Sequence, residues 1–157
     1  MKISNDYLKK YKLDSSSMKD IDTLIKYKLN SILKYASNLS NKELDEINTY
    51  VKDNVPKQLN NYKLINIDSN IVGCILVENK DDGVIIDELY IEEKYRNNGI
   101  GTDLINNVIS NNNIVYLWVY KLNVKAIRLY KRLEFKIIKE TENRYYMQFN
   151  KKNNKGD

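Results

Sequence analysis

The feature that most constrains the fold of this chain is a strand, a glycine-containing turn and a helix that follow one another. An apolar run at residues 84–91 leads through a charged turn to an arginine and two glycines, Arg96, Gly99 and Gly101. Apolar residues then recur at helical spacing over residues 104–109. Glycines keep side chains away from a ligand, and the first N–H groups of a helix have no intrahelical partner. The segment therefore predicts an anion-binding turn.

Such a turn suits a pyrophosphate group, which the unpaired N–H groups and the positive end of the helix dipole would hold, with Arg96 adding charge. The same spacing also occurs in plain turns between a strand and a helix, so the surrounding sequence has to decide. A dinucleotide fold would need a third glycine, and a nucleoside triphosphate loop would need Gly-Lys followed by Ser or Thr. Here Thr102 and Asp103 follow Gly101, so the chain has neither motif.

A second segment narrows the choice of ligand. Asn123 follows an apolar run at 114–120 and is a good N-cap for a helix that carries Ala126 and Tyr130 on one face. Asn123 and Tyr130 are about two turns apart, or ~10 Å along the helix axis. A small residue and a tyrosine on that face fit a ligand channel, although ordinary helix packing explains them too. Together the two segments predict a site for an acyl-coenzyme A.

In order and spacing, the two segments resemble the GCN5-related N-acetyltransferase (GNAT) family. The resemblance covers residues 62–149 well and the preceding residues only in general plan. It is carried by a strand at 85–91, the turn at 95–101, a strand at 114–120 and the helix at 123–135. The chain departs from the family where Glu134 replaces the usual glycine and Glu93 a common proline. A glycine just after the helix at 123–135 would adopt a left-handed backbone without strain. Glu134 at that position therefore predicts either a different helix end or mild strain.

The resemblance implies an α/β (α+β) fold: a mixed, mostly antiparallel central sheet flanked by about four helices. The parallel strands 85–91 and 114–120 would splay apart and hold acetyl-coenzyme A, with no metal. Pantetheine would pair with the backbone of Leu89 and Ile91 as an added strand does, and the Leu89 N–H would face the acetyl oxygen. The implied cofactor-binding residues are Leu89, Tyr90, Ile91, Arg96, Asn97, Asn98, Gly99, Ile100, Gly101, Thr102, Asn123, Ala126 and Tyr130.

The resemblance also suggests the catalytic residues. Tyr130 would be the general acid that protonates the departing thiolate. Asp87 and Glu88 are the candidate bases, and strict alternation along a strand would place them on opposite faces, so that one at most faces the amine. Asp87 is preferred because it stands two residues before Leu89. Either carboxylate could instead be solvated or salt-bridged, with a chain of water molecules as the base.

The resulting functional prediction is an acetyl-coenzyme A-dependent N-acetyltransferase whose acceptor, a primary amine of a small molecule or peptide, attacks directly in a ternary complex. One alternative is a non-catalytic acyl-coenzyme A-binding or regulatory module, which would need the turn but not Tyr130. The other is an acetyltransferase acting on aminoacyl-tRNA, which the formal charge of +5 allows. Nucleic acid is the less favoured partner because the 26 basic residues are scattered among 21 acidic ones.

The acceptor is expected to meet the segments 37–61 and 139–146, where the family varies. In the first segment, acidic residues could attract a cationic amine or could simply form an exposed helix face. In the second, and on the strand at 114–120, aromatic residues could line a pocket or pack between strands. The residues in question are Glu43, Asp45, Glu46, Trp118, Tyr145 and Tyr146.

Composition favours one domain at residues 1–150, followed by a frayed tail at 151–157. The 157 residues, 42% of them hydrophobic, suffice for one core, and Cys74 within an apolar run is expected to be buried. Without histidine, a general base has to be a carboxylate, Tyr, Lys, Cys, the terminal amine or water. No apolar run approaches the ~20 residues of a membrane span and no signal peptide is evident, so a cytoplasmic monomer or homodimer is expected.

Local patterns predict the remaining elements. Capping-box sequences place helices at 18–37 and 41–59, and Pro56 should kink or end the second because proline has no N–H. A hairpin is expected from strands at 62–68 and 71–78 around the Ser69-Asn70 turn. Closing strands are expected at 135–139 and 144–149.

Overall fold

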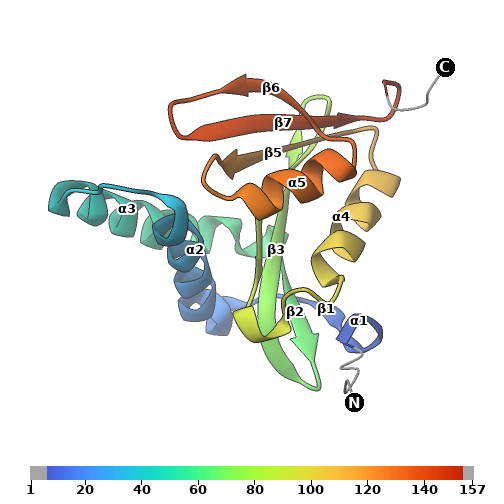
Figure 1. The fold of residues 1–157 in the computed structure, drawn as a ribbon. Helices are drawn as coiled ribbons and strands as arrows, with labels where there is room; N and C mark the ends of the chain where they lie inside the picture. The colour runs from blue at the N-terminus through green and yellow to red at the C-terminus, as the bar shows by residue number, and fades with distance from the viewer. Residues whose placement is uncertain (1–6, 154–157) are drawn as a thin grey trace, which may run out of the picture.

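A computed structural model describes residues 7–153 and shows a twisted sheet with helices packed around it (Figure 1). Within those residues the sheet has seven strands, in the order β1-β2-β3-β4-β5-β7-β6. They are β1 Lys12–Ser15, β2 Tyr62–Ile67, β3 Asn70–Lys80, β4 Gly83–Ile91, β5 Ile114–Tyr120, β6 Lys136–Glu140 and β7 Arg144–Asn150. Only β4 and β5 pair in parallel; every other neighbouring pair is antiparallel. The predicted mixed, mostly antiparallel α/β fold is confirmed.

The helices start close to where the capping residues predicted, and end earlier. They are α1 Tyr7–Lys10, α2 Ile21–Tyr35, α3 Asn41–Asn54, α4 Ile100–Ser110 and α5 Val124–Arg132, with 3-10 turns at Met18–Asp20, Pro56–Asn61 and Glu93–Tyr95. Ser40 caps α3, because its side chain accepts the N–H of Glu43 at 3.1 Å. Pro56 separates α3 from a 3-10 turn, so the helix predicted over 41–59 stops at Asn54. None of the helices in residues 7–153 has the length and apolarity that crossing a bilayer requires.

Two apolar clusters pack on opposite faces of the sheet. The first joins α4 and α5 to the sheet and includes the buried Leu104, Ile105, Val115, Leu117 and Phe135. The second joins α2 and α3 to β2, β3 and β4, and consists of the buried Leu24, Tyr27, Val51, Val55, Tyr62, Leu64, Cys74 and Leu76. Cys74 is fully buried, as its apolar setting predicted. The sheet therefore separates an α4 and α5 side from an α2 and α3 side.

The parallel pair at the centre of the sheet is short. Only Val84, Ile85 and Ile86 of β4 pair with β5, opposite residues 115–117. Beyond this point β4 continues to pair with β3 as far as Ile91, and β5 continues to pair with β7 as far as Tyr120. Residues 87–91 of β4 and 118–120 of β5 thus diverge, and we call this region the splay. It confirms the splayed parallel strands predicted from the sequence.

A β-bulge in β4 lies where the splay begins. Leu76 of β3 pairs with Glu88 and Val77 pairs with Ile86, so Asp87 is an extra residue with no partner on β3. A bulge interrupts the alternation of side chains between the two faces. Ile86 packs in the first cluster, whereas Glu88 contacts Tyr62 of the second. The prediction that Asp87 and Glu88 point to opposite faces depended on strict alternation, which fails at this position.

The ends of the chain add features that the sequence patterns did not predict. The short elements α1 and β1 precede α2, and β1 forms an edge strand paired with β2. Tyr7 of α1 packs edge-on against Tyr95, with ring centroids 4.9 Å apart. At the other end, the Lys151 N–H donates to the Asn113 carbonyl at 2.9 Å, while residues 154–157 of the expected tail lie outside the described residues.

Candidate active site

The turn between β4 and α4 exposes the first N–H groups of α4. Asn97 and Gly99 both have left-handed backbones, with φ of 63° and 85°, which Asn and Gly adopt more readily than other residues. The first backbone bond of α4 runs from the Asp103 N–H to the Gly99 carbonyl at 3.0 Å. The N–H groups of residues 100–102 therefore have no acceptor within the helix. This arrangement, together with the helix dipole, can hold a phosphate anion.

Side chains from within and beyond the turn hold it in place. The Asn98 amide donates to the carbonyls of Tyr95 and Arg96, at 3.2 and 2.9 Å. Lys125 of α5 donates to the side-chain oxygen of Asn97 at 3.1 Å. This lysine brings a positive charge to the turn between β4 and α4, which we call the phosphate turn after its predicted ligand. The sequence patterns did not identify Lys125. Its position two residues after the Asn123 N-cap was the only signal that could have indicated it.

Gly101 faces the strand that was predicted to carry pantetheine. A Cβ atom built on Gly101 would lie 3.7 Å from Cδ1 of Ile91 and 3.9 Å from Cδ2 of Leu89. These are ordinary contact distances, so the protein itself leaves room for a methyl group. Unlike Gly99, Gly101 does not have a positive φ. Glycine at this position therefore leaves space beside β4 and is not required by the backbone conformation.

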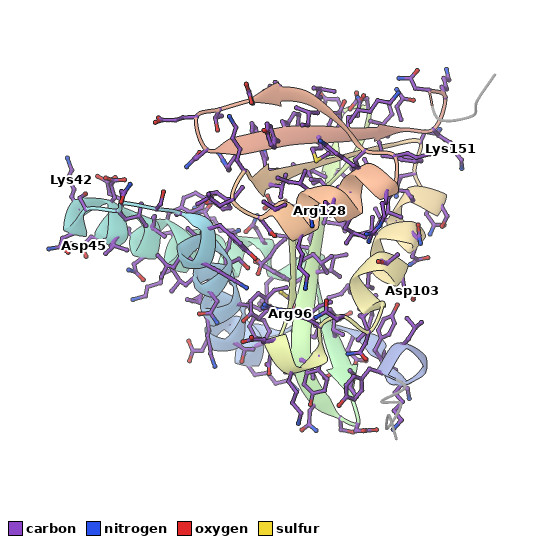
Figure 2. All side chains as sticks on the ribbon, in the orientation of Figure 1. Lys42, Asp45, Arg96, Asp103, Arg128 and Lys151 are labelled. Carbon is purple, nitrogen blue, oxygen red and sulfur yellow. The ribbon has the colours of Figure 1, made fainter. Side chains whose placement is uncertain are left out.

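Arg96 fixes the end of β4 as well as adding charge. Its Nε donates to the Ile91 carbonyl at 2.5 Å, and its guanidinium carbon lies 5.4 Å from the centre of the Tyr90 ring. Tyr90 in turn stacks on Tyr27 of α2, with centroids 4.6 Å apart. Figure 2 shows Arg96 in the middle of the molecule, between α2 and α4. Arg96 was predicted to act through its charge alone, and the structure adds these positioning contacts.

On α5, the predicted N-cap is observed, and Tyr130 lies on the same helix. The side-chain oxygen of Asn123 accepts the Ala126 N–H at 3.3 Å, which confirms the cap. Burial, with a smaller contribution from the nearby Tyr35, raises the pKa of Tyr130 to about 12. The Tyr130 hydroxyl is therefore protonated at neutral pH, as a proton donor has to be. Tyr35, at the end of α2, was not recognised from the sequence.

The two candidate bases lie on the same side of the sheet in different environments. Glu88 is 7% exposed, and it accepts the Tyr62 hydroxyl at 2.6 Å and the Cys74 thiol at 3.4 Å. Its burial raises the pKa of the carboxyl, against the lowering effect of these two donors. The side chain of Asp87, by contrast, is exposed to solvent.

Asp87 is positioned by two residues that the sequence patterns did not identify. Its carboxylate accepts a hydrogen bond from Gln58 at 3.1 Å and lies 3.9 Å from the Lys28 ammonium. Gln58 comes from the 3-10 turn after α3, and Lys28 from α2. Asp87 therefore also reaches toward the α2 and α3 side, and of the two carboxylates it is the accessible one.

The structure places the residues considered for acceptor binding at two distant locations. Asp45 is at the outer end of α3 beside Lys42, well away from Arg96 and from Arg128 on α5 (Figure 2). The Glu43 carboxylate takes part in the capping of α3 by Ser40. Trp118 and Tyr146, by contrast, border the splay and contact each other with ring centroids 4.5 Å apart.

Comparison with known proteins supports the fold and the family. A model described as the acetyltransferase (GNAT) family matches residues 31–135, whereas comparison with curated protein sequences gave no match. Among solved structures, the chain is similar to PaiA N-acetyltransferase from Thermoplasma acidophilum in complex with coenzyme A, at 19% identity and TM-score 0.71. It is also similar to Arabidopsis thaliana Naa50 in complex with the bisubstrate analogue CoA-Ac-MVNAL, at 27% identity and TM-score 0.60. Both alignments cover 89% of this chain and 98% of the other.

The fold and site define a domain in which a helix N-terminus with unpaired N–H groups lies beside a splayed parallel strand pair. Because the family model covers more than half of the chain, the chain belongs to the GNAT family of acetyltransferases. It is an acetyl-coenzyme A-dependent acyltransferase that acts on an amine acceptor. The predicted family, enzyme class and cofactor are thus confirmed.

Proposed function

We propose that the protein transfers the acetyl group of acetyl-coenzyme A to a primary amine of a peptide or small molecule, by direct attack in a ternary complex. The observation that carries the proposal is the splay. Leu89 and Ile91 on β4 pack toward α4 and α5, where the phosphate turn and Tyr130 are, while Asp87 reaches the opposite side. The cofactor and the amine can therefore approach the same point from opposite sides of the sheet.

The residues around the phosphate turn fit acetyl-coenzyme A. The N–H groups of residues 100–102 would bind the pyrophosphate, with Lys125 adding a positive charge. The space beside Gly101 would admit the pantetheine arm, which would pair with Leu89 and Ile91. On α5, Asn123 and Ala126 would line the same arm. The backbone of Tyr90, Asn97 and Asn98 completes the proposed cofactor site.

Acetyl-coenzyme A supplies an acetyl group activated as a thioester. Asp87, directly or through water, would accept the proton that the amine nitrogen loses as it bonds to the acetyl carbon. Tyr130 would give its hydroxyl proton to the sulfur as the carbon–sulfur bond breaks. The Leu89 N–H would donate to the acetyl oxygen as negative charge develops there. We prefer Asp87 to Glu88 as the base because Glu88 is buried and already accepts two hydrogen bonds.

Two observations favour an N-terminal peptide amine among the possible acceptors. The Naa50 complex, at 27% identity, was solved with an analogue that joins coenzyme A to a peptide. The acceptor side of the splay also has aromatic side chains from three elements: Tyr35 at the end of α2, and Trp118 and Tyr146 on β5 and β7. Aromatic rings provide contact area for a peptide at little cost in conformational entropy.

The test is an acetyl-coenzyme A assay with pairs of peptides that differ only in a free or a blocked N-terminus. Released thiol and peptide mass are the readouts. We expect thiol release, and a mass gain of one acetyl group, only with the free amine. Binding of acetyl-coenzyme A by calorimetry, without thiol release for any peptide or small amine, would favour the regulatory module instead. Acetylation confined to aminoacyl-tRNA, with strong salt dependence of binding, would favour the nucleic-acid acceptor.

A further inference from the structure

A group of basic and aromatic residues lies on the acceptor side of β5, β6 and β7. We call it the cationic patch and define it as Trp118, Lys139, Arg144 and Tyr146. Trp118 pairs with Tyr146, and Tyr146 pairs with Lys139, so these side chains share one face of the sheet. Arg144 pairs with Tyr120, which is two residues from Trp118 and so also points to that face.

This face is the one to which Asp87 also turns. Val115, Leu117 and Val119 of β5 pack in the first cluster, under α4 and α5. Trp118 therefore points to the opposite side, where α2 and α3 lie. Within residues 7–153, the second cluster, which joins α2 and α3 to the sheet, contains no residue of β5, β6 or β7. The patch thus lies beside the helices and is not packed under them.

The two cations of the patch sit directly over the aromatic rings. The Arg144 guanidinium carbon is 4.6 Å from the centre of the Trp118 ring system. The Lys139 ammonium is 5.5 Å from the Trp118 centre and 5.0 Å from the Tyr146 centre. These contacts orient both charges at a fixed place over β5 and β7. Among the described residues, neither cation forms a salt bridge, although Lys121 nearby pairs with Glu140 at 2.9 Å.

The opposite edge of the splay carries carboxylates. Asp87 and Glu88 are on β4, and Glu78 of β3 accepts a hydrogen bond from Gln58 at 2.5 Å. Lys28 faces this group, 3.9 Å from Asp87, and Lys80 of β3 lies on the same face, 6.0 Å from the centre of the Tyr146 ring. The acceptor side therefore has carboxylates along β3 and β4, with Lys28 and Lys80 as the cations near them, and a basic edge along β5, β6 and β7. Such an arrangement is complementary to a molecule with a positive amine and a negative group.

The register sets the distance between these two edges. Trp118 directly follows Leu117, which pairs with Ile86, and so lies level with Asp87 at the start of the splay. Neighbouring strands are about 4.8 Å apart. A charge held over Trp118 is then roughly 5–10 Å, or one to two strand spacings, from Asp87 across the sheet. With a hydrogen bond of about 2.8 Å at each end, this separation leaves room for the first residue of a peptide, between its N-terminal amine and its side-chain anion.

We propose that the cationic patch binds a carboxylate or phosphate of the acceptor, so that the preferred acceptor is a peptide amine whose own first residue carries an anionic side chain. This inference rests on the proposed N-acetyltransferase function and specifies its substrate class. Arg144 and Lys139 provide charge-assisted hydrogen bonds to the anion, and Trp118 provides a flat surface beside it. Asp45 cannot select a cationic acceptor in this way, because it lies at the outer end of α3 (Figure 2).

The decisive experiment compares matched peptides on the unmodified enzyme. One pair has Asp or Asn as the first residue, and a second pair has phosphoserine or serine there. We expect kcat/KM to be at least about 10-fold higher for the anionic member of at least one pair, and the two pairs distinguish a carboxylate from a phosphate. Equal rates within both pairs would overturn the patch assignment while leaving the enzyme function intact. Absence of thiol release with every peptide and every small amine would instead contradict the proposed function.

Variants then locate the preference on the patch. Arg144→Gln and Lys139→Gln should each remove most of the preference, mainly through KM, with little change for the neutral peptide. Arg144→Lys keeps the positive charge but removes the bidentate hydrogen bonding of the guanidinium, so it separates the two contributions. Lys139→Glu should instead favour a peptide that begins with lysine. Lys151→Gln is the control, because Figure 2 shows Lys151 near the C-terminal end of the chain. If the preference survives in both Gln variants, another surface binds the anion and the proposal is wrong.

Discussion

At the scale of single residues, the end of α5 shows how one unusual side chain reveals backbone strain. The Glu134 N–H donates to the Lys131 carbonyl at 3.0 Å, and the Phe135 N–H donates to the Tyr130 carbonyl at 2.9 Å. This pair of bonds is a Schellman motif, which requires a left-handed residue after the helix. Glu134 supplies it with φ of 72°. The strain anticipated from the sequence is therefore present, and the helix end is the usual one.

Replacing Glu134 with glycine should stabilise the protein. A non-glycine residue in the left-handed region costs about 1–2 kcal/mol, and Glu134→Gly should recover part of this, less what the glutamate side chain contributes. Urea unfolding at pH 7 measures the change. Glu93→Gly is the matched control, since Glu93 is also exposed but has no positive φ, and glycine there should destabilise. Equal effects of the two variants would show that φ at Glu134 stores no strain.

Gly101 offers a test of the cofactor position that leaves the fold unharmed. Because a Cβ atom would make ordinary contacts at 3.7 and 3.9 Å, Gly101→Ala should fold and gain up to about 1 kcal/mol from helix propensity. The added methyl group would occupy space beside Leu89 and Ile91, so acetyl-coenzyme A should bind at least about 10-fold more weakly. Calorimetry and urea unfolding measure the two effects separately. Unchanged affinity in a folded variant would remove the cofactor from this position.

At the scale of elements, the sequence predicted best where local chemistry and tertiary packing agree. The strand at 114–120 was predicted with its observed bounds, because its alternate residues pack under α4 and α5. The Asn123 cap was predicted because a short side chain can accept the third N–H of the helix. α1 and β1 were missed, since each has four residues and β1 is exposed throughout, which leaves no apolar period to detect.

The β4 bulge was missed for a different reason. A single extra residue has no composition of its own, and it is defined only by the pairing of Leu76 and Val77 with the neighbouring strand. This one residue decides the sides to which Asp87 and Glu88 turn. Lys28 and Gln58 were also unpredictable as neighbours of Asp87, because they reach it from α2 and from the turn after α3. Contacts of this kind depend on how elements pack and not on spacing along the chain.

The bulge predicts a pH dependence of stability through Glu88. Because burial raises the pKa of Glu88 in the folded protein, its neutral form is favoured there. Its stabilising contribution is complete below the unfolded pKa of about 4.3 and is lost as pH rises through the folded pKa. The free energy of unfolding of the Glu88→Gln variant should therefore increase relative to that of the parent as pH rises from about 4 toward neutral. Urea unfolding across this range measures it, and a constant or falling difference would contradict the assignment.

At the scale of the whole molecule, the sheet consists of two parts joined by a short seam. β1 to β4 pair continuously, as do β5, β7 and β6, but within residues 7–153 the two parts share only three parallel pairs, Val84 to Ile86 with residues 115–117. A ligand bound in the splay would contact β4, α4 and α5 together. It would therefore connect the two parts beyond the seam, and binding should stabilise the folded molecule as a unit. Saturation to 100 times Kd stabilises by about 2.7 kcal/mol.

This whole-molecule stabilisation can separate the binding role of Tyr130 from its chemical role. Tyr130→Phe keeps the ring that packs near Phe135, at 5.8 Å between centroids, and removes the only proton the side chain can give. The rise in Tm on adding acetyl-coenzyme A should then persist, while kcat should fall by about 10²-fold, the low end for general acid catalysis, since a thiolate leaves readily. Tyr50→Phe is the matched control, because Tyr50 is 55% exposed on α3, and both quantities should be unchanged there. A variant at Tyr130 that retains full kcat would assign this tyrosine to packing alone and require another proton donor for the thiolate, whereas loss of the Tm shift would place its hydroxyl in cofactor binding.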